Sequence, residues 1–81
     1  MSRQRQDYDK HVVEATSLPL RDGGFTVHVD LEHCAGSHLD VTHFESGQRF
    51  TTDEEALAAG INLGKHKVDE GYESGTPVVN N

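Results

Sequence analysis

The stretch FTVHVDLEHCAGSHLDVTHF, residues 25–44, decides the fold because its first half alternates apolar and polar side chains. The apolar members of this alternation are Phe25, Val27, Val29 and Leu31. A period of two is typical of a β-strand with one buried face and one solvated face. A second strand is predicted at about residues 38–44, and the turn signal ESGQ directly after it marks its end. The stretch therefore predicts a β-hairpin.

The loop of this hairpin decides which side chains meet, because a shift of one residue exchanges the two faces of a strand. A two-residue loop at residues 35–36 would set Leu31 against Asp40. A three-residue loop at residues 35–37 instead pairs Leu31 with Val41 and keeps the buried face apolar. We therefore predict the three-residue loop, which leaves Phe44 on the polar face.

Upstream of the hairpin, Asp22-Gly23 is the signal of a tight turn between two strands. A two-residue turn there would set Leu18 opposite Val27. The run from about Lys10 to Leu20 is then the first strand, and Pro19 favours a position at the edge of the sheet for it. The sequence thus predicts a three-stranded antiparallel meander.

Downstream, the stretch TTDEEALAAGINLGKHKVDEGY predicts a helix from about Asp53 to Glu70. Thr52 and Glu55 have the spacing of a capping box, in which each side chain binds a backbone N–H of the first turn. Gly71 is suited to end the helix. The apolar positions of this segment recur at helical spacing, which predicts one face packed on the sheet.

Two glycines, Gly60 and Gly64, share one face of the predicted helix. Each costs roughly 1 kcal/mol relative to alanine in a helix interior, so their presence calls for a reason. We expect them to let the helix backbone lie close to the sheet. The alternative is that they form a seat for a partner helix or a ligand.

These elements predict an α+β fold, a three-stranded antiparallel β-meander with one C-terminal α-helix packed on one face. A single domain is expected over residues 8–72. Residues 1–7 and 73–81 are polar or turn-forming without a period, and we expect a disordered N-terminal arm and a disordered C-terminal tail. A chain of 81 residues has a marginal core, so it depends on good packing, a partner or a metal.

Charge and cysteine content restrict the classes of function. The formal net charge is −7. The segment between Asp7 and Glu73 contains five basic residues and all fourteen acidic residues of the chain. Binding to nucleic acid relies on cationic side chains, so this balance argues against that partner. No apolar run is long enough to span a membrane. Cys34 has no second cysteine to pair with, which indicates a reducing compartment, and we expect a cytoplasmic protein.

The hairpin also concentrates the residue types that bind metals. In the predicted register the best ligand set, at one end of the hairpin, is Glu32, Cys34, His38 and Asp40. Zinc needs three or four converging ligands, and Cys34-x₃-His38 is half of a common zinc unit. The two-residue loop would instead set His28 opposite His43. The simpler interpretation is a solvated polar face, and no cofactor is predicted.

Two open sheet edges and an acidic surface without a pocket predict a protein that binds another protein or a second copy of itself. An exposed edge is a template for strand addition. The predicted contacts are Phe44 and one of Val12 and Val13, because adjacent strand residues face opposite sides. A local bulge that turns Phe44 inward is the alternative. No motif of a nucleophile, a phosphate loop or a dinucleotide site is present, so no catalytic residue and no enzymatic activity are predicted.

The C-terminal segment QRFTTDEEALAAGINLGKHKVDEGY resembles the same region of small single-domain bacterial proteins of unassigned function. The shared pattern is an aromatic residue, Thr, Glu-Ala, a glycine-containing helix and an aliphatic-Asp-x-Gly ending. The matching positions are Phe50, Thr51, Glu55, Ala56, Gly64, Val68, Asp69 and Gly71. The match covers about a quarter of the chain, and the group implies no activity.

The order of three strands and a helix also resembles arm-type DNA-binding domains of integrases and plant-type three-strand-plus-helix DNA binders. The resemblance implies an alternative function, nucleic-acid binding through the sheet face or the arm with Arg3 and Arg5. The sheet positions concerned are His28, Asp30, Glu32, Asp40 and Thr42. Domains of this kind carry Arg and Lys there, so this sequence departs from their pattern.

Overall fold

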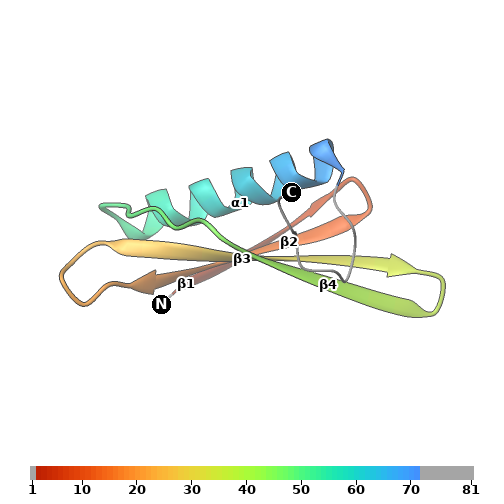
Figure 1. Cartoon of the computed structure of the whole chain (residues 1–81), viewed down its shortest axis with the longest axis horizontal. Coiled ribbons are helices and arrows are strands. Elements are labelled where there is room, and N and C mark those ends of the chain that lie inside the picture. The colour runs from red at the N-terminus through yellow and green to blue at the C-terminus, as the bar shows by residue number, and fades with distance from the viewer. Residues whose placement is uncertain (1, 72–81) are drawn as a thin grey trace, which may run out of the picture.

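A computed structural model describes residues 2–71, which form a four-stranded antiparallel sheet with one helix on one face (Figure 1). The elements are β1 (Ser2–Tyr8), β2 (His11–Pro19), β3 (Phe25–Ala35), β4 (His38–Glu45) and α1 (Asp53–Glu70). The strands lie in the order β1-β2-β3-β4, so each strand pairs with its neighbour in sequence. The α+β class with an antiparallel sheet and a C-terminal helix is confirmed, but the sheet has four strands where three were predicted.

The additional strand is β1, which pairs with β2 along its whole length. Its residues 2–8 fall almost entirely in the segment assigned to a disordered arm, and that assignment is corrected here. Asp9 and Lys10 form the turn to β2, with φ of 48° and 64°. Positive φ at both central residues suits a tight hairpin turn. Because β1 covers its outer side, β2 is an interior strand, and Pro19 is tolerated as its last residue. The predicted tail, residues 73–81, lies outside the described residues.

The hairpin of β2 and β3 is one residue out of the predicted register. Leu18 lies opposite Thr26, where Val27 was expected. A loop over residues 20–24 replaces the predicted two-residue turn, and within it Gly24 adopts a φ of 83°. The shift turns the other set of alternating β2 side chains toward the helix. These buried side chains are Val13, Ala15 and Ser17.

The hairpin of β3 and β4 adopts neither of the registers considered from the sequence. Its loop is Gly36-Ser37, and Val29 lies opposite Phe44. Phe44 therefore faces the helix side with 9% of its surface exposed, and Val41 faces outward with 50% exposed. The register itself turns Phe44 inward, because its position in the ladder matches that of Val29. Burying the larger aromatic side chain removes more apolar surface from water than burying valine would.

The core lies between α1 and the sheet. Its buried apolar side chains are Val13, Ala15, Val27, Val29, Leu31, Phe44, Ala56, Ile61 and Val68. The helix backbone runs along β1, β2 and β3, as Figure 1 shows. It reaches β4 through side chains, for example where the Lys67 amino group lies 5.4 Å from the centre of the Phe44 ring.

The predicted helix and its caps are confirmed. The helix runs from Asp53 to Glu70, and Gly71 caps its C-terminus. The Glu55 N–H donates to Thr52 Oγ1 at 3.1 Å, while the Thr52 N–H donates to Glu55 Oε1 at 3.2 Å. This reciprocal pair is the capping box that the sequence predicts.

The two interior glycines allow a close approach of α1 to the sheet. A Cβ atom added to Gly60 would lie 2.6 Å from Val27 Cγ2 and 2.9 Å from Ala15 Cβ. A Cβ atom on Gly64 would overlap Val13 Cγ1. The packing interpretation of these glycines is therefore confirmed.

Both ends of α1 are also attached to β1. At the N-terminal end, Ser17 Oγ accepts from the Ser2 N–H at 3.3 Å and donates to the Asp53 carboxylate. At the other end, the Tyr8 hydroxyl donates to the Asp69 carboxylate at 2.8 Å. The bond to Asp69 raises the pKa of Tyr8. The first strand thus holds the helix at two points.

The contact between Ser17 and Asp53 gives a testable pH dependence. The hydrogen bond from Ser17 lowers the pKa of Asp53 in the folded protein. Its stabilising effect is present above the unfolded pKa and is lost as pH falls through the folded pKa. We therefore expect Ser17→Ala to lower the free energy of unfolding at pH 7 and to reduce its decline between about pH 5 and pH 3. Urea unfolding across this range is the measurement.

Asp22→Asn is the control for this experiment, because Asp22 is a surface carboxylate with a side chain that is 77% exposed. Its ion pair with Arg49 is expected to contribute little, as exposed pairs usually do. If Ser17→Ala and the wild type lose stability in parallel as pH falls, the Ser17–Asp53 bond has no role in acid sensitivity.

Candidate functional site

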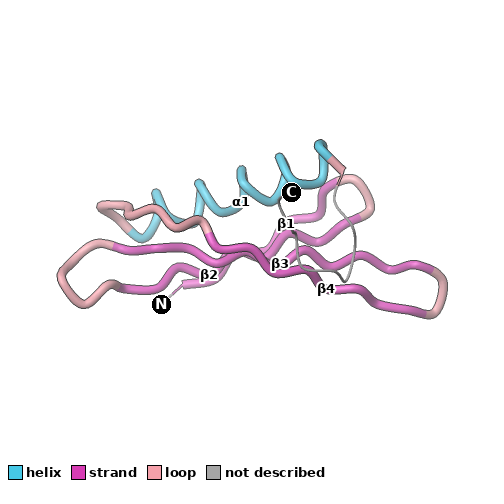
Figure 2. Tube along the Cα trace, viewed as in Figure 1, coloured by secondary structure: helices cyan, strands magenta, loops and turns pink. Residues whose placement is uncertain are grey.

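The sheet face opposite α1, here named the open face, carries the polar half of the β3 alternation. It has no helix over it among the described residues (Figure 2). On β3 and β4 its residues are Thr26, His28, Asp30, Glu32, Cys34, Leu39, Val41, His43 and Glu45. The ladder register decides which of these side chains are neighbours, so it also decides which candidate site exists.

The four predicted metal ligands are divided between the two faces. Glu32 and Cys34 lie on the open face, opposite Val41 and Leu39 respectively. His38 and Asp40 belong to the alternate positions of β4, which point to the helix side. The structure brings this second pair together, since His38 Nε2 lies 3.1 Å from Asp40 Oδ1. It does not bring the four residues to one point, because the register differs from the predicted one.

The predicted partner contacts are also divided. Val13 is fully buried in the core and Phe44 is nearly so, which leaves neither available on the surface. Val12 lies on the open face, opposite Glu32, and is half-buried. Thus Val12 is the outward member of the adjacent valine pair.

Among residues 2–71, the exposed large hydrophobic side chains lie elsewhere, on β4. Leu39 is 56% exposed and Val41 is 50% exposed. Sequence reasoning missed them because the predicted register buried Val41. The sequence shows that β4 contains hydrophobic residues, but it does not show which face of the sheet each side chain lies on.

A groove, here named the β4 groove, lies between β4 and α1 and has a volume of about 330 Å³. Its lining combines the apolar side chains Phe44, Phe50, Ala59 and Leu63 with the polar or charged residues Glu45, Ser46, Gln48 and Lys67. The groove exists because α1 lies over the first three strands. It adds apolar surface beside the edge of the sheet.

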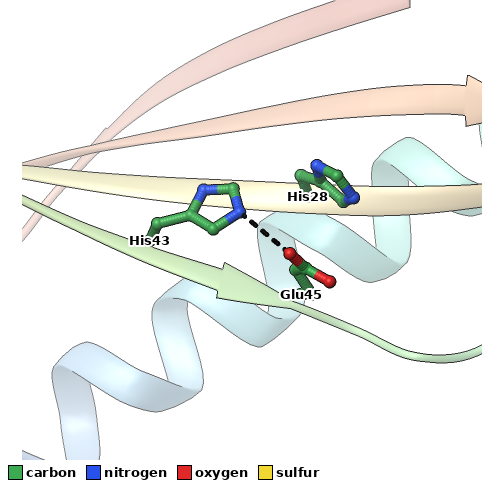
Figure 3. Close-up of side chains that lie close together, drawn as sticks. All are labelled: His28, His43 and Glu45. Atoms are coloured by element: carbon green, nitrogen blue, oxygen red, sulfur yellow. Dashed lines mark ion pairs between the residues drawn. The ribbon is translucent and has the colours of Figure 1, made fainter. Parts of the chain in front are cut away.

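A second cluster joins His28, His43 and Glu45 on the open face. The ladder sets His28 opposite Glu45 and Asp30 opposite His43, so all four side chains are close neighbours. The ligand atoms of His28, His43 and Glu45 lie within 4.8 Å of one another. Figure 3 shows these three side chains close together.

The orientation of His43 within this cluster is set by two carboxylates. Its Nδ1 lies 2.7 Å from Asp30 Oδ1. Its Nε2 lies 3.6 Å from Glu45 Oε2, the ion pair that is dashed in Figure 3. The rings of His28 and His43 meet edge to face, with centroids 5.2 Å apart. Sequence reasoning brought these two histidines together only in a register that it rejected. In the register adopted they are diagonal neighbours.

The cationic side chain Arg5 lies at the β1 side of the open face. Its guanidinium binds Glu14 at 2.8 Å and Glu32 at 3.3 Å. These hydrogen bonds, first that with Glu14, raise the pKa of Arg5. Arg5 thereby balances part of the negative charge of the open face.

Comparison with protein-family models, with curated proteins and with solved structures finds no match for this chain. Within residues 2–71, no helix is both long enough and apolar enough to cross a membrane. The function is therefore argued from the residues themselves.

Proposed function

We propose that this chain is a non-enzymatic protein-interaction module that pairs through β4 with a second copy of itself. The observation that carries the proposal is the exposure of Leu39 and Val41, both on this edge strand. Large apolar side chains beside unpaired backbone groups favour the addition of another strand. The β4 groove lies on the other face of the same edge, and its lining does not include Leu39 or Val41.

The two edges of the sheet differ in a way that favours β4. The β1 strand reads SRQRQDY, and its side chains are polar or charged apart from the Tyr8 ring. Charged residues such as Arg3 and Arg5 protect an edge against further pairing. The β4 strand reads HLDVTHFE, with no Lys, Arg or Pro to serve that purpose.

The sequence of β4 is compatible with self-pairing. An antiparallel pairing with a two-fold axis at Val41 sets each Val41 against its symmetry equivalent and Leu39 against His43. Asp40 then faces Thr42, so no like charges lie directly opposite, which would be destabilising. A two-fold axis at Asp40 would instead set the two Asp40 carboxylates against each other. The arrangement at Val41 covers both exposed hydrophobic side chains.

The remaining properties of the proposal follow from charge and cysteine chemistry. The net charge of −7 and the carboxylates of the open face disfavour nucleic acid as the partner. The exposed, free thiol of Cys34 is compatible with a reducing compartment, which supports a cytoplasmic location.

Sedimentation velocity over a range of concentrations tests the proposal. We expect the wild type to form dimers and Val41→Lys to weaken the association by about tenfold or more, because the lysine charge would be placed in an apolar contact. Gln4→Lys is the matched control, since it adds the same charge to the exposed β1 edge. The control is expected to associate like the wild type.

A wild type that sediments as a monomer at all concentrations contradicts self-pairing. So does equal association of Val41→Lys and the wild type. A monomeric chain that captures a different protein, and loses it on Val41→Lys, would assign β4 to another partner and overturn the choice of a second copy.

A further inference from the structure

We propose that His28, His43 and Glu45 form a binding site for a late first-row divalent transition-metal ion, with zinc as the reference ion. The site lies on the open face and does not depend on pairing through β4. It differs from the ligand set predicted from the sequence, which the structure divides between two faces.

The donor set fits this class of ion. Two imidazole nitrogens and one carboxylate oxygen are a combination that proteins use for zinc, with a further position left for water or another ligand. Imidazole ligands suit zinc, copper and nickel, whereas calcium and magnesium prefer oxygen ligands alone. The chemistry of the cluster therefore selects the transition metals.

The geometry needs only small side-chain movements. The three ligand atoms lie within 4.8 Å of one another, and zinc bonds of about 2.0–2.2 Å place tetrahedral ligands roughly 3.4 Å apart. His43 and Glu45 have side chains that are 48% and 66% exposed, so their rotamers are free to adjust. His28 and Glu45 are direct partners in the ladder, so the backbone holds their Cβ atoms in place.

The position of Asp30 is an independent sign of a metal site. Its carboxylate accepts a hydrogen bond from His43 Nδ1 at 2.7 Å, which fixes the hydrogen on that nitrogen. His43 Nε2 then faces Glu45 with its lone pair available for a metal. A carboxylate that orients a ligating histidine in this way is a recurring feature of metal sites.

The charges of the cluster also favour a cation. The carboxylates of Asp30 and Glu45 both lie against His43, one on each side of the ring, and a neutral ring does not balance their charge. The nearby Arg5 is directed to Glu14 and Glu32 instead. A divalent ion beside His43 would balance the two carboxylates that Arg5 leaves unneutralised.

Zinc titration of the full chain, followed by calorimetry and by the ¹⁵N signals of the histidine rings, tests this site. We expect one zinc ion per chain, with coupled shifts at His28 and His43 and coordination through His43 Nε2. His28→Ala, His43→Ala and the nearly isosteric Glu45→Gln are each expected to weaken binding by at least about tenfold. Asp30→Asn is expected to weaken it by about 10–100-fold, through the orientation of His43.

Two variants serve as matched controls. His66→Ala removes an exposed histidine that also contacts a carboxylate, Glu70 at 2.9 Å, but lies on α1. Cys34→Ser removes a thiol, a group that binds zinc in other proteins. Cys34 lies on the same face of β3 as His28 but outside the proposed site. Both variants are expected to bind zinc like the wild type. Circular dichroism checks that every variant is folded.

Loss of binding in the controls, or ring shifts confined to His38 and His66, would place the ion elsewhere and overturn the proposal. Unchanged binding in Glu45→Gln and His43→Ala would do the same. A second measurement is the thermal midpoint of unfolding. Zinc is expected to raise it in the wild type and to raise it less in His43→Ala, because a ligand stabilises the native state in proportion to the logarithm of its binding.

Discussion

Replacing Gly60 and Gly64 together with alanine is expected to destabilise this protein, although alanine normally stabilises a helix. The new Cβ atoms would overlap Val27, Ala15 and Val13. Each overlap is expected to cost about 1–3 kcal/mol, and the gain in helix propensity returns about 1 kcal/mol per site. The Ala15 Cβ is fixed by the backbone and cannot move aside. Two sites at these values cost about 2–6 kcal/mol and regain about 2 kcal/mol, so we expect a net loss of up to about 4 kcal/mol for the double variant. Urea unfolding followed by circular dichroism measures it.

A control and a rescue variant make this experiment specific. Asn62→Ala lies on the exposed side of the same helix and is expected to gain a few tenths of a kcal/mol from propensity alone. Val13→Ala removes the atom that a Cβ at Gly64 would overlap, so Gly64→Ala should cost less in that background. If Gly64→Ala instead stabilises the protein as Asn62→Ala does, α1 does not lie this close to the sheet.

Leu31→Ala is expected to have the largest effect of any single truncation in the core. Leu31 is fully buried and is the largest of the fully buried side chains. Truncation of a buried leucine costs about 2–5 kcal/mol. For 81 residues the whole free energy of unfolding is roughly 4–12 kcal/mol, so this variant is expected to lose a large share of its stability. Thermal and urea unfolding measure the loss.

Leu39→Ala is the matched control, because it removes the same atoms from a leucine that is 56% exposed. At concentrations where the chain is monomeric, its effect on the free energy of unfolding is expected to stay within about 0.5 kcal/mol, as for most surface changes. Equal losses in the two variants would contradict the register of β3 and β4, which assigns the two leucines to opposite faces.

The helix and the two faces of β3 could be predicted because their signals are local. The capping box of Thr52 and Glu55 involves residues three apart, and the alternation of β3 lies within one strand. The fourth strand could not be predicted in this way. Residues 2–8 carry no apolar alternation, since β1 is an edge strand whose outward side chains meet water. Its pairing is fixed by the Asp9-Lys10 turn, which lacks the glycine that usually signals a hairpin.

The candidate sites could not be predicted because they depend on register. The two-residue loop Gly36-Ser37 moved the pairing of β4 by one residue from the expected position. That single shift buried Phe44, exposed Val41 and separated His38 from Cys34. The fold class does not change when a hairpin slips, but the set of neighbouring side chains on each face changes entirely.

The two attachments of α1 to β1 bear on how this chain can fold during synthesis. Tyr8 binds Asp69, which is 61 residues further along the chain, and Ser2 reaches Asp53 through Ser17. The first strand therefore leaves the ribosome long before either of its distant anchors exists. The first strand can form a hairpin with β2 early. Its contacts with the helix close a loop of about 60 residues, and this closure is entropically costly until the helix has packed. Final docking of the opening strand must then wait for the last residues of the helix to emerge.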